Sequence, residues 1–143
     1  MSNLYQLVYT SRKQPSCNNV EIDKILDSCK RNNGSKDITG VLLHTDQNFI
    51  QYLEGPKEII NLYDLIKEDK RHMNVVLLSY RITKKRFFPS WQMGYKDMSG
   101  NKLQLLTENL PKEKLIFQQI LNGEIPSENS AINMISSFFK KAA

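Results

Sequence analysis

Residues 48–55 read NFIQYLEG, and the pattern within this stretch decides the fold. Alternate side chains of a β-strand share a face, so Gln51 lies on the same face as the apolar Phe49 and Leu53. A primary amide removed from water without hydrogen-bond partners costs about 2–7 kcal/mol. A partner for Gln51 is therefore expected inside the fold.

The segments around this strand predict an α+β domain. In chain order, the predicted elements are a strand at 4–10, a helix at 20–33, strands at 38–44 and 48–54, a helix at 57–69, and strands at 75–80 and 91–95. This βαββαββ order predicts a ferredoxin-like core with two helices on one face of a mixed five-stranded sheet. Asn18 and Glu21 form a capping box that places the start of the first helix near Asn19, and Gly34 is expected to end it.

The composition changes after this core, so residues 1–98 are expected to form one domain and residues 99–143 a helical extension. Pro111 suits the first turn of a helix, and Gly123 is expected to stop that helix. Ser127 then opens a helix whose apolar positions are Ile132, Ile135 and Phe139. These apolar side chains must be buried against the domain or against a second subunit.

The net charge of +5 arises from 20 Lys and Arg against 15 Asp and Glu, and much of the excess lies at residues 81–86. This run is typical of a solvated strand end and loop. The alternative is a ferredoxin-like module that binds RNA or another anionic partner. The strands lack the basic and aromatic pattern of RNA-recognition domains, which argues against that alternative.

Motifs for catalysis are absent from the sequence. It has no nucleophile elbow, phosphate-binding loop, dinucleotide fingerprint or HExxH zinc motif, so an enzyme such as a small hydrolase is not expected. Cys17 and Cys29 have neither CxxC spacing nor ligand-spaced histidines, which argues against a zinc site and a disulfide framework. No signal peptide and no 18-residue apolar run are found, so we expect a cytoplasmic protein without a membrane segment.

A few polar side chains remain as candidates for a binding site. The Tyr9 hydroxyl reaches the same interior as Gln51 if their two strands are neighbours. Asn32 and Asn33 either cap the first helix or direct an amide into a cavity that holds a planar heteroaromatic ligand. His44 is expected to be exposed at a hairpin end. His72 is expected to be a cation at the C-terminal end of the second helix, where the helix dipole stabilises positive charge.

The chain resembles the BLUF domains, which are blue-light sensors that bind a flavin, from about residue 4 to residue 95. The resemblance rests on the order and spacing of LVYTS at 7–11, RNN at 31–33, ITGVL at 38–42, FIQYLEG at 49–55, DKRH at 69–72 and SWQM at 90–93. It implies a flavin held noncovalently between the two core helices above the sheet. FAD is the usual cofactor, and FMN or riboflavin are the alternatives.

The resemblance also implies roles for particular residues. Tyr9 matches the electron and proton donor, and Gln51 matches the amide between that phenol and the flavin. Trp91 and Met93 are candidates to pass a change at Gln51 to the tail helices, with ordinary core packing as the alternative for both. The other implied cofactor contacts are Ile25, Cys29, Asn32, Asn33, Phe49, Ile66, Asp69, Arg71 and His72.

The implied function is a non-enzymatic photoreceptor. Light drives electron and proton transfer from Tyr9 through Gln51, and the altered hydrogen bonds signal to a separate, unidentified protein. Assembly into a homo-oligomer through the tail helices is expected by the same resemblance, without direct binding of nucleic acid or membrane.

Overall fold

The structure is a computed structural model that describes residues 3–15, 17–88, 93–100, 102, 110–122 and 132–135, without the side chains of residues 30, 32–35 and 121. Trp91 lies outside the described residues, as do Gly123, Ser127 and Phe139. Within the described part, no helix is both long enough and apolar enough to cross a membrane.

A mixed five-stranded sheet forms the centre of the fold, with the strand order β4-β1-β3-β2-β5. Its strands are β1 (Leu4–Lys13), β2 (Thr39–His44), β3 (Asn48–Gly55), β4 (His72–Thr83) and β5 (Gly94–Asp97). Neighbouring strands are antiparallel except for β2 and β5, which are parallel. The predicted ferredoxin-like arrangement is confirmed.

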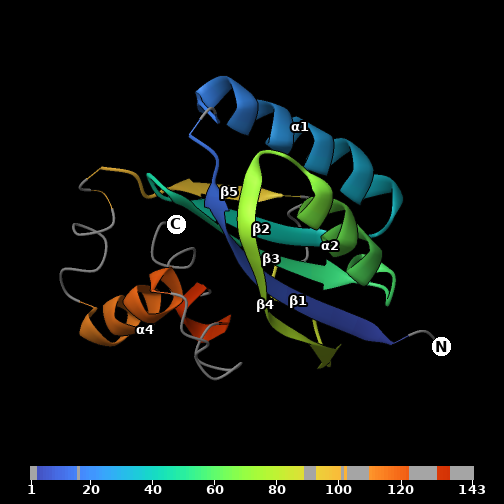
Figure 1. Cartoon of the computed structure of the whole chain (residues 1–143). Helices are drawn as coiled ribbons and strands as arrows, with labels where there is room; N and C mark the ends of the chain where they lie inside the picture. The colour runs from blue at the N-terminus through green and yellow to red at the C-terminus, as the bar shows by residue number, and fades with distance from the viewer. Residues whose placement is uncertain are drawn as a thin grey trace.

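Two helices, α1 (Asn19–Ser35) and α2 (Ile59–Glu68), cover one face of the sheet, and helix α4 (Pro111–Leu121) lies against the other (Figure 1). Each face has its own packed apolar cluster. The cluster under α1 and α2 includes Leu7, Phe49 and Leu53 of the sheet, and the cluster under α4 includes Val8 and Tyr52. We call these two sides the helix-pair face and the tail face.

The start of α1 follows its sequence signal, but its end does not. The Glu21 amide donates a 3.1 Å hydrogen bond to Asn18 Oδ1, which confirms the predicted cap. The helix continues through Gly34 to Ser35, so the predicted stop at Gly34 is wrong. Asp37 instead adopts a left-handed conformation with φ of 59°. Aspartate tolerates this region better than most residues.

The boundaries of three later elements also differ from their predictions. Helix α2 begins at Ile59 rather than residue 57, because the amide of Ile59 bonds to the carbonyl of Pro56 in a preceding turn. Strand β4 begins at His72 rather than residue 75 because it pairs with β1 as far as Lys13. The last strand, predicted at 91–95, is described as residues 94–97, so Met93 precedes it, and residues 91 and 92 lie outside the described residues.

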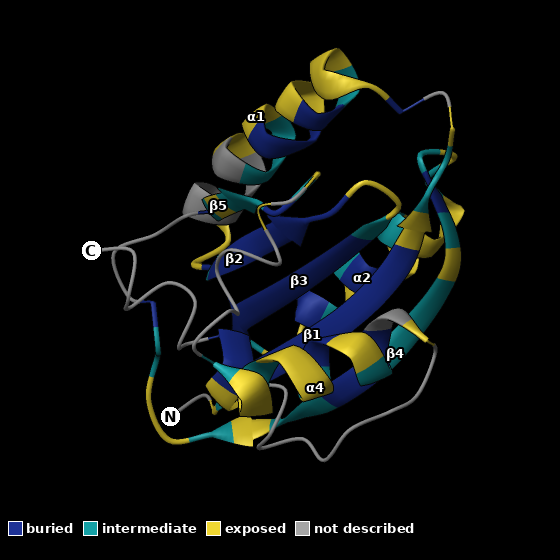
Figure 2. Cartoon of the chain, turned by 90° about the vertical axis from the view of Figure 1, so that its left-hand side faces the viewer, coloured by how far each residue is buried: buried dark blue, intermediate teal, exposed yellow. Residues whose placement is uncertain are grey.

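The described tail residues pack against the domain. Helix α4 begins at Pro111, as predicted, and residues 132–135 are helical. The buried apolar side chains of this tail that join the tail-face cluster are Phe117, Ile120, Ile132, Met134 and Ile135. The sequence left open whether the tail is buried against the domain or against a second subunit, and its described apolar side chains are buried against the domain. The outward face of α4 is exposed (Figure 2).

Candidate functional site

Tyr9 and Gln51 meet in the middle of the helix-pair face. The two residues are direct partners in the β1–β3 register, and the Tyr9 hydroxyl donates a 2.6 Å hydrogen bond to Gln51 Oε1. Both side chains are buried, with 1% and 2% of their surface exposed. The partner expected for the buried amide is therefore Tyr9.

The other end of the Gln51 amide faces two sulfur atoms. Nε2 lies 3.5 Å from Met93 Sδ and 3.8 Å from Cys29 Sγ. Sulfur is a weak hydrogen-bond acceptor, so the amide is held firmly at its oxygen and loosely at its nitrogen. A ligand that offered a carbonyl oxygen or a ring nitrogen at this place would form a stronger bond with Nε2.

A cavity of about 190 Å³ opens between α1, α2 and the sheet, beside this amide. Its lining residues are Tyr9, Ile25, Ser28, Cys29, Gln51, Leu62, Leu65, Ile66, Asp69, Arg71 and His72. Eight of these were predicted site residues, and they come from five helices or strands and one connection. The structure thus brings most of the predicted set around one space.

The cavity has an aliphatic side and a polar side. Ile25 on α1 and Ile66 on α2 supply apolar walls. On the polar side, the Arg71 guanidinium binds both oxygens of Asp69, with its shortest contact at 2.7 Å. Hydrogen bonds from Arg71 lower the pKa of Asp69, so this carboxyl is ionised at neutral pH. A planar heteroaromatic ring with polar edges fits such surroundings, and a flavin ring is of this kind.

His72 is buried at the edge of this site, which corrects the prediction of a cation at a helix end. It is the first residue of β4, its Nδ1 lies 2.8 Å from Ser11 Oγ, and its ring packs 4.9 Å from that of Phe49. Burial lowers the pKa of His72, so the imidazole is neutral at pH 7. Phe49 supports His72 from the sheet and is not among the cavity-lining residues.

Two predicted site residues have side chains outside the described part of the structure, and some residues that line the cavity were not predicted. The side chains of Asn32 and Asn33 lie outside the described part of α1, so their proposed role is untested. Ser28, Leu62 and Leu65 line the cavity although none of them was predicted to do so. Ser28 directly precedes Cys29, which was a predicted site residue on α1, and this adjacency is the sequence feature from which its position could have been predicted.

The phenol and the thiol of the site are both protonated at neutral pH. Burial raises the pKa of Tyr9 well above its usual value, with further contributions from Cys29 and Asp69. Burial also raises the pKa of Cys29, against a lowering effect of its contact with Gln51. Tyr9 therefore holds a proton that it can give away on oxidation, and Cys29 is a neutral thiol.

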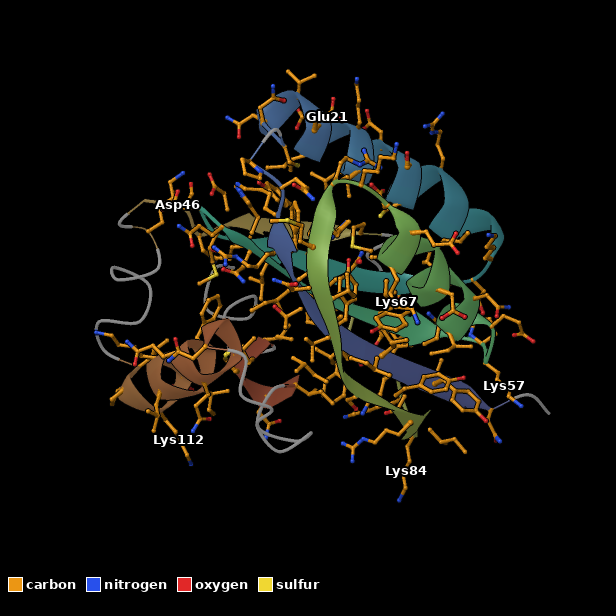
Figure 3. All side chains as sticks on the ribbon, in the orientation of Figure 1. Glu21, Asp46, Lys57, Lys67, Lys84 and Lys112 are labelled. Carbon is orange, nitrogen blue, oxygen red and sulfur yellow. The ribbon has the colours of Figure 1, made fainter. Side chains whose placement is uncertain are left out.

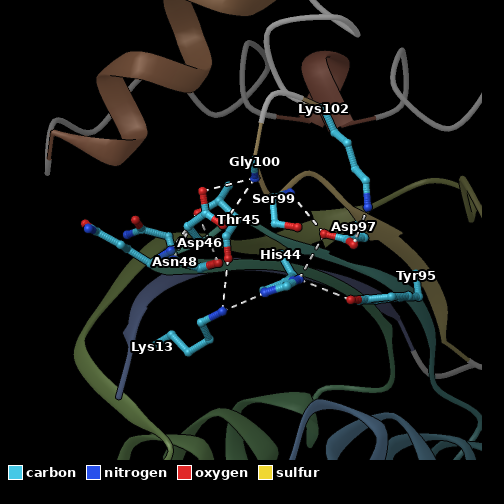
Figure 4. A network of polar contacts seen from close by, with 11 residues as sticks. Lys13, His44, Thr45, Asp46, Asn48, Tyr95, Asp97, Ser99, Gly100 and Lys102 are labelled. Atoms are coloured by element: carbon cyan, nitrogen blue, oxygen red, sulfur yellow. Dashed lines mark hydrogen bonds and ion pairs between the residues drawn. The ribbon is translucent and has the colours of Figure 1, made fainter. Parts of the chain in front are cut away.

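His44 lies at the other end of the sheet and is also buried, with 3% of its surface exposed, so the predicted exposed position is wrong. Figure 4 shows its imidazole between Lys13 and Tyr95, with Nε2 2.7 Å from Lys13 Nζ and Nδ1 3.1 Å from the Tyr95 hydroxyl. Asp97, 3.4 Å from Nδ1, also binds Lys102 at 2.7 Å. This network ties the end of β5 to the hairpin.

Acidification below pH 6.5 is expected to destabilise the protein. His44 and His72 are its two histidines, and burial lowers the pKa of both, with Lys13 adding to the effect at His44. The unfolded chain takes up protons near its ordinary histidine pKa of about 6.5, whereas the folded chain does so only at lower pH. The free energy of unfolding therefore falls as pH drops from 7 to 5.

Urea unfolding at pH 7.5, 6.0 and 5.0 measures this dependence. His72→Gln and His44→Gln should each reduce the slope between these values. Equal unfolding free energies across the range in the original protein would contradict the prediction.

Comparison with known proteins identifies the family. The family model described as sensors of blue-light using FAD, BLUF, matches residues 4–94. Photoactivated adenylate cyclase subunit beta of Euglena gracilis is 34% identical over 90 residues, which cover 62% of this chain and 10% of that protein. This chain thus spans about a tenth of the length of such curated relatives.

Two solved structures agree with this family match. The dark-state structure of the BLUF protein BlrB matches 96% of this chain and 98% of its own, with 26% identity and a TM-score of 0.74. A bacterial light-regulated adenylyl cyclase matches 84% of this chain and 34% of its own, with 31% identity and a TM-score of 0.71. The chain belongs to the BLUF family of flavin-binding blue-light sensors.

Proposed function

We propose that FAD binds in the cavity between α1, α2 and the sheet, and that Tyr9 and Gln51 turn light absorption into altered hydrogen bonding. The 2.6 Å hydrogen bond between these two residues, at the cavity wall, carries the proposal. The cavity of about 190 Å³ is smaller than the roughly 300–1,000 Å³ of typical ligand pockets. It therefore suits the ring system rather than a whole dinucleotide, so FMN and riboflavin remain alternatives.

The proposed binding contacts follow from the lining of the cavity. Ile25 and Ile66 would hold the two flat faces of the ring, because one comes from each helix. The polar groups would hold its edges and its ribityl chain. These groups are Cys29, Asn32, Asn33, Asp69, Arg71 and His72.

A bound flavin supplies absorption of blue light and, once excited, an oxidant strong enough to take an electron from a phenol. Tyr9 is the electron donor in the proposal. Loss of an electron makes a phenol a much stronger acid, so its proton moves to Gln51 Oε1, the atom 2.6 Å away. When the electron returns, Tyr9 takes one proton back from Gln51. Loss of the Oε1 proton restores the amide, which can be left in a different rotamer, whereas loss of an Nε2 proton leaves the other tautomer.

The size of this change limits what it can do. A rearranged hydrogen bond has a net value of about 1 kcal/mol, which biases a two-state element but does not unfold a helix. Met93 is the first described residue outside the pair to respond, because Gln51 Nε2 lies 3.5 Å from its sulfur. Trp91 remains a further candidate by resemblance.

The proposed output is a change in contact with a separate signalling protein in the cytoplasm. We propose that residues 1–98 sense light and that residues 99–143 pass the change on and support a homo-oligomer, without an enzymatic step in this chain. Leu115 on α4 supports a contact surface there, because 58% of this apolar residue is exposed.

The alternative of an RNA or anionic-partner module without flavin is not favoured. The family match covers residues 4–94, which include strands β1 to β4 and helices α1 and α2. Within the basic run, Arg86 is directed inward to Asp37 and Thr39 rather than outward.

The test of the function is the colour and light response of the purified protein. It should be yellow, its absorption should shift slightly to the red under blue light, and the shift should reverse in the dark. Chromatography of the released cofactor would distinguish FAD from FMN and riboflavin. A colourless protein that takes up none of the three would contradict the proposal.

The substitution Ile66→Trp is expected to lower flavin affinity by about tenfold or more, because an indole would fill part of the cavity. Titration of flavin fluorescence measures the affinity, and circular dichroism checks that the variant folds. Leu115→Trp adds the same indole on α4, outside the cavity, and should bind flavin normally. Unchanged affinity in a folded Ile66→Trp protein would show that the ring binds elsewhere.

A further inference from the structure

Glu54 is a fully buried carboxylate, with 0% of its surface exposed, that the proposed photochemistry does not use. Four donors surround its two oxygens. Oε1 accepts hydrogen bonds from the Tyr52 hydroxyl at 2.8 Å and the Phe87 amide at 2.8 Å. Oε2 accepts from the Thr39 hydroxyl at 3.0 Å and the Phe88 amide at 2.9 Å. Each oxygen thus has two donors, the arrangement that suits an ionised, acceptor-only group.

Arg86 closes the network around this carboxylate. Its guanidinium donates to Thr39 Oγ1 at 2.8 Å and to the backbone oxygen of Glu54 at 3.1 Å. It also binds the backbone oxygen of Asp37 at 2.8 Å and pairs with the Asp37 carboxylate at 3.1 Å. Lys84, two residues earlier, is exposed and extends away from the sheet (Figure 3). The connection after β4 therefore turns inward at Arg86 and is held from there to Phe88.

Strand β3 presents Glu54 and Gln51 to opposite faces of the sheet. Gln51 shares the helix-pair face with Phe49, whereas Glu54 shares the tail face with Tyr52. The connection from β4 to β5 touches both faces of this one strand. Its residues 87 and 88 bond to Glu54 on the tail face, and Met93 bonds to Gln51 on the helix-pair face.

The held segment also touches the tail. Phe88 is buried in the cluster that contains Phe117 and Ile120 of α4, and its ring packs 5.7 Å from that of Tyr52. Only four residues separate Phe88 from Met93 in the chain. A short piece of backbone thus joins the contact of Gln51 to the packing of α4, and Glu54 fixes one end of that piece.

We propose that Glu54 is a positioning residue that, from the tail face, fixes where Met93 stands against Gln51. It thereby sets the rate of dark recovery and how far a light-driven change reaches α4. The inference rests on the proposed function of the flavin site. Its direct support is that the backbone amides of Phe87 and Phe88 both bind the buried carboxylate of Glu54. Phe88 lies only five residues before Met93, whose sulfur contacts Gln51.

The test is Glu54→Gln, which keeps the size of the side chain but replaces one acceptor oxygen with a donor that faces other donors. The variant should bind flavin and show the full red shift, because Tyr9 and Gln51 are intact. Gln51 Nε2 meets the Met93 sulfur when Oε1 faces Tyr9, so this contact favours the amide orientation seen here. Dark recovery should slow by at least about threefold, because the contact is loosened in the variant. Hydrogen exchange should quicken at residues 87, 88 and 93, also in flavin-free protein.

Two further variants separate positioning from general destabilisation. Tyr52→Phe removes one donor to Glu54 but leaves both backbone amides bound, so it should recover at the original rate. Thr39→Val removes the hydroxyl that Glu54 and Arg86 share. Unlike Tyr52→Phe, it therefore also takes one contact away from Arg86, the residue next to Phe87, and it provides a milder loosening if Glu54→Gln fails to fold. Thr39→Val should then show the slowed recovery and faster exchange in smaller degree.

These measurements distinguish a failure of the proposed role of Glu54 from a failure of the proposed photoreceptor function. If the original protein shows no red shift, the proposed function fails. If the original protein responds and the loosened variants recover at its rate or faster, the inference fails while the function stands. Slower recovery with unchanged exchange at residues 87, 88 and 93 would also overturn the positioning role.

Discussion

Replacement of Tyr9 with phenylalanine is expected to give a yellow, flavin-binding protein that forms no red-shifted product under blue light. The ring and its packing against Tyr63, 5.8 Å away, remain, but the hydroxyl that donates to Gln51 is gone. The variant therefore has no proton to transfer to Oε1. Difference absorption spectra before and during illumination measure the effect.

Tyr52→Phe is the matched control for this experiment. Tyr52 is as deeply buried as Tyr9, lies on the neighbouring strand and also donates a hydrogen bond, but its hydroxyl serves the tail face. Each change leaves a buried acceptor short of one donor, at a cost of about 1–3 kcal/mol in stability. Only Tyr9→Phe should lose the photoproduct. A normal red shift in Tyr9→Phe would exclude this phenol as the donor.

The second large effect is expected for Gln51→Leu. Leucine is close to glutamine in size but offers no hydrogen bond, so the Tyr9 proton has no acceptor and the cavity has no amide to rearrange. We expect flavin binding to persist and the red shift to vanish. Absorption spectra recorded under blue light and during the following dark period measure the loss of the red shift.

Gln6→Leu is the matched control for Gln51→Leu. Gln6 has 2% of its surface exposed, the same as Gln51, and it lies on β1 as an acceptor for the Tyr52 hydroxyl at 3.4 Å. It is therefore a buried glutamine of the tail face. A red shift that disappears in both variants would point to general damage rather than to a role of the Gln51 amide.

The central part of the site could be predicted because it follows from alternation along two strands. Gln51 on an apolar face required a partner, and Tyr9 on the matching face of β1 was the available phenol. The register that pairs them confirms this expectation. The inward positions of α1, Ile22, Ile25 and Leu26, also followed from helical spacing and are buried.

The errors arose where burial depends on contacts between distant segments. His72 was assigned to a helix end because the local charges suit that position, but β4 begins there by pairing with Lys13 of β1. His44 was assigned to an exposed turn, yet β5 and the hairpin enclose it. Register shifts on both sides of Tyr9 and Thr10 have no local sequence signal either. The roles that came from resemblance alone, as for Asn33, stay predictions.

Because β3 presents functional side chains on both of its faces, the proposed flavin cavity and the tail surface are separated by the thickness of a single sheet. A protein that approaches α4 would not obstruct the entry of a cofactor between α1 and α2. The same separation would permit the tail helices to be exchanged for those of another sensor while the cofactor compartment is retained. Residues whose backbone or side chains meet Glu54 would then have to be transferred together.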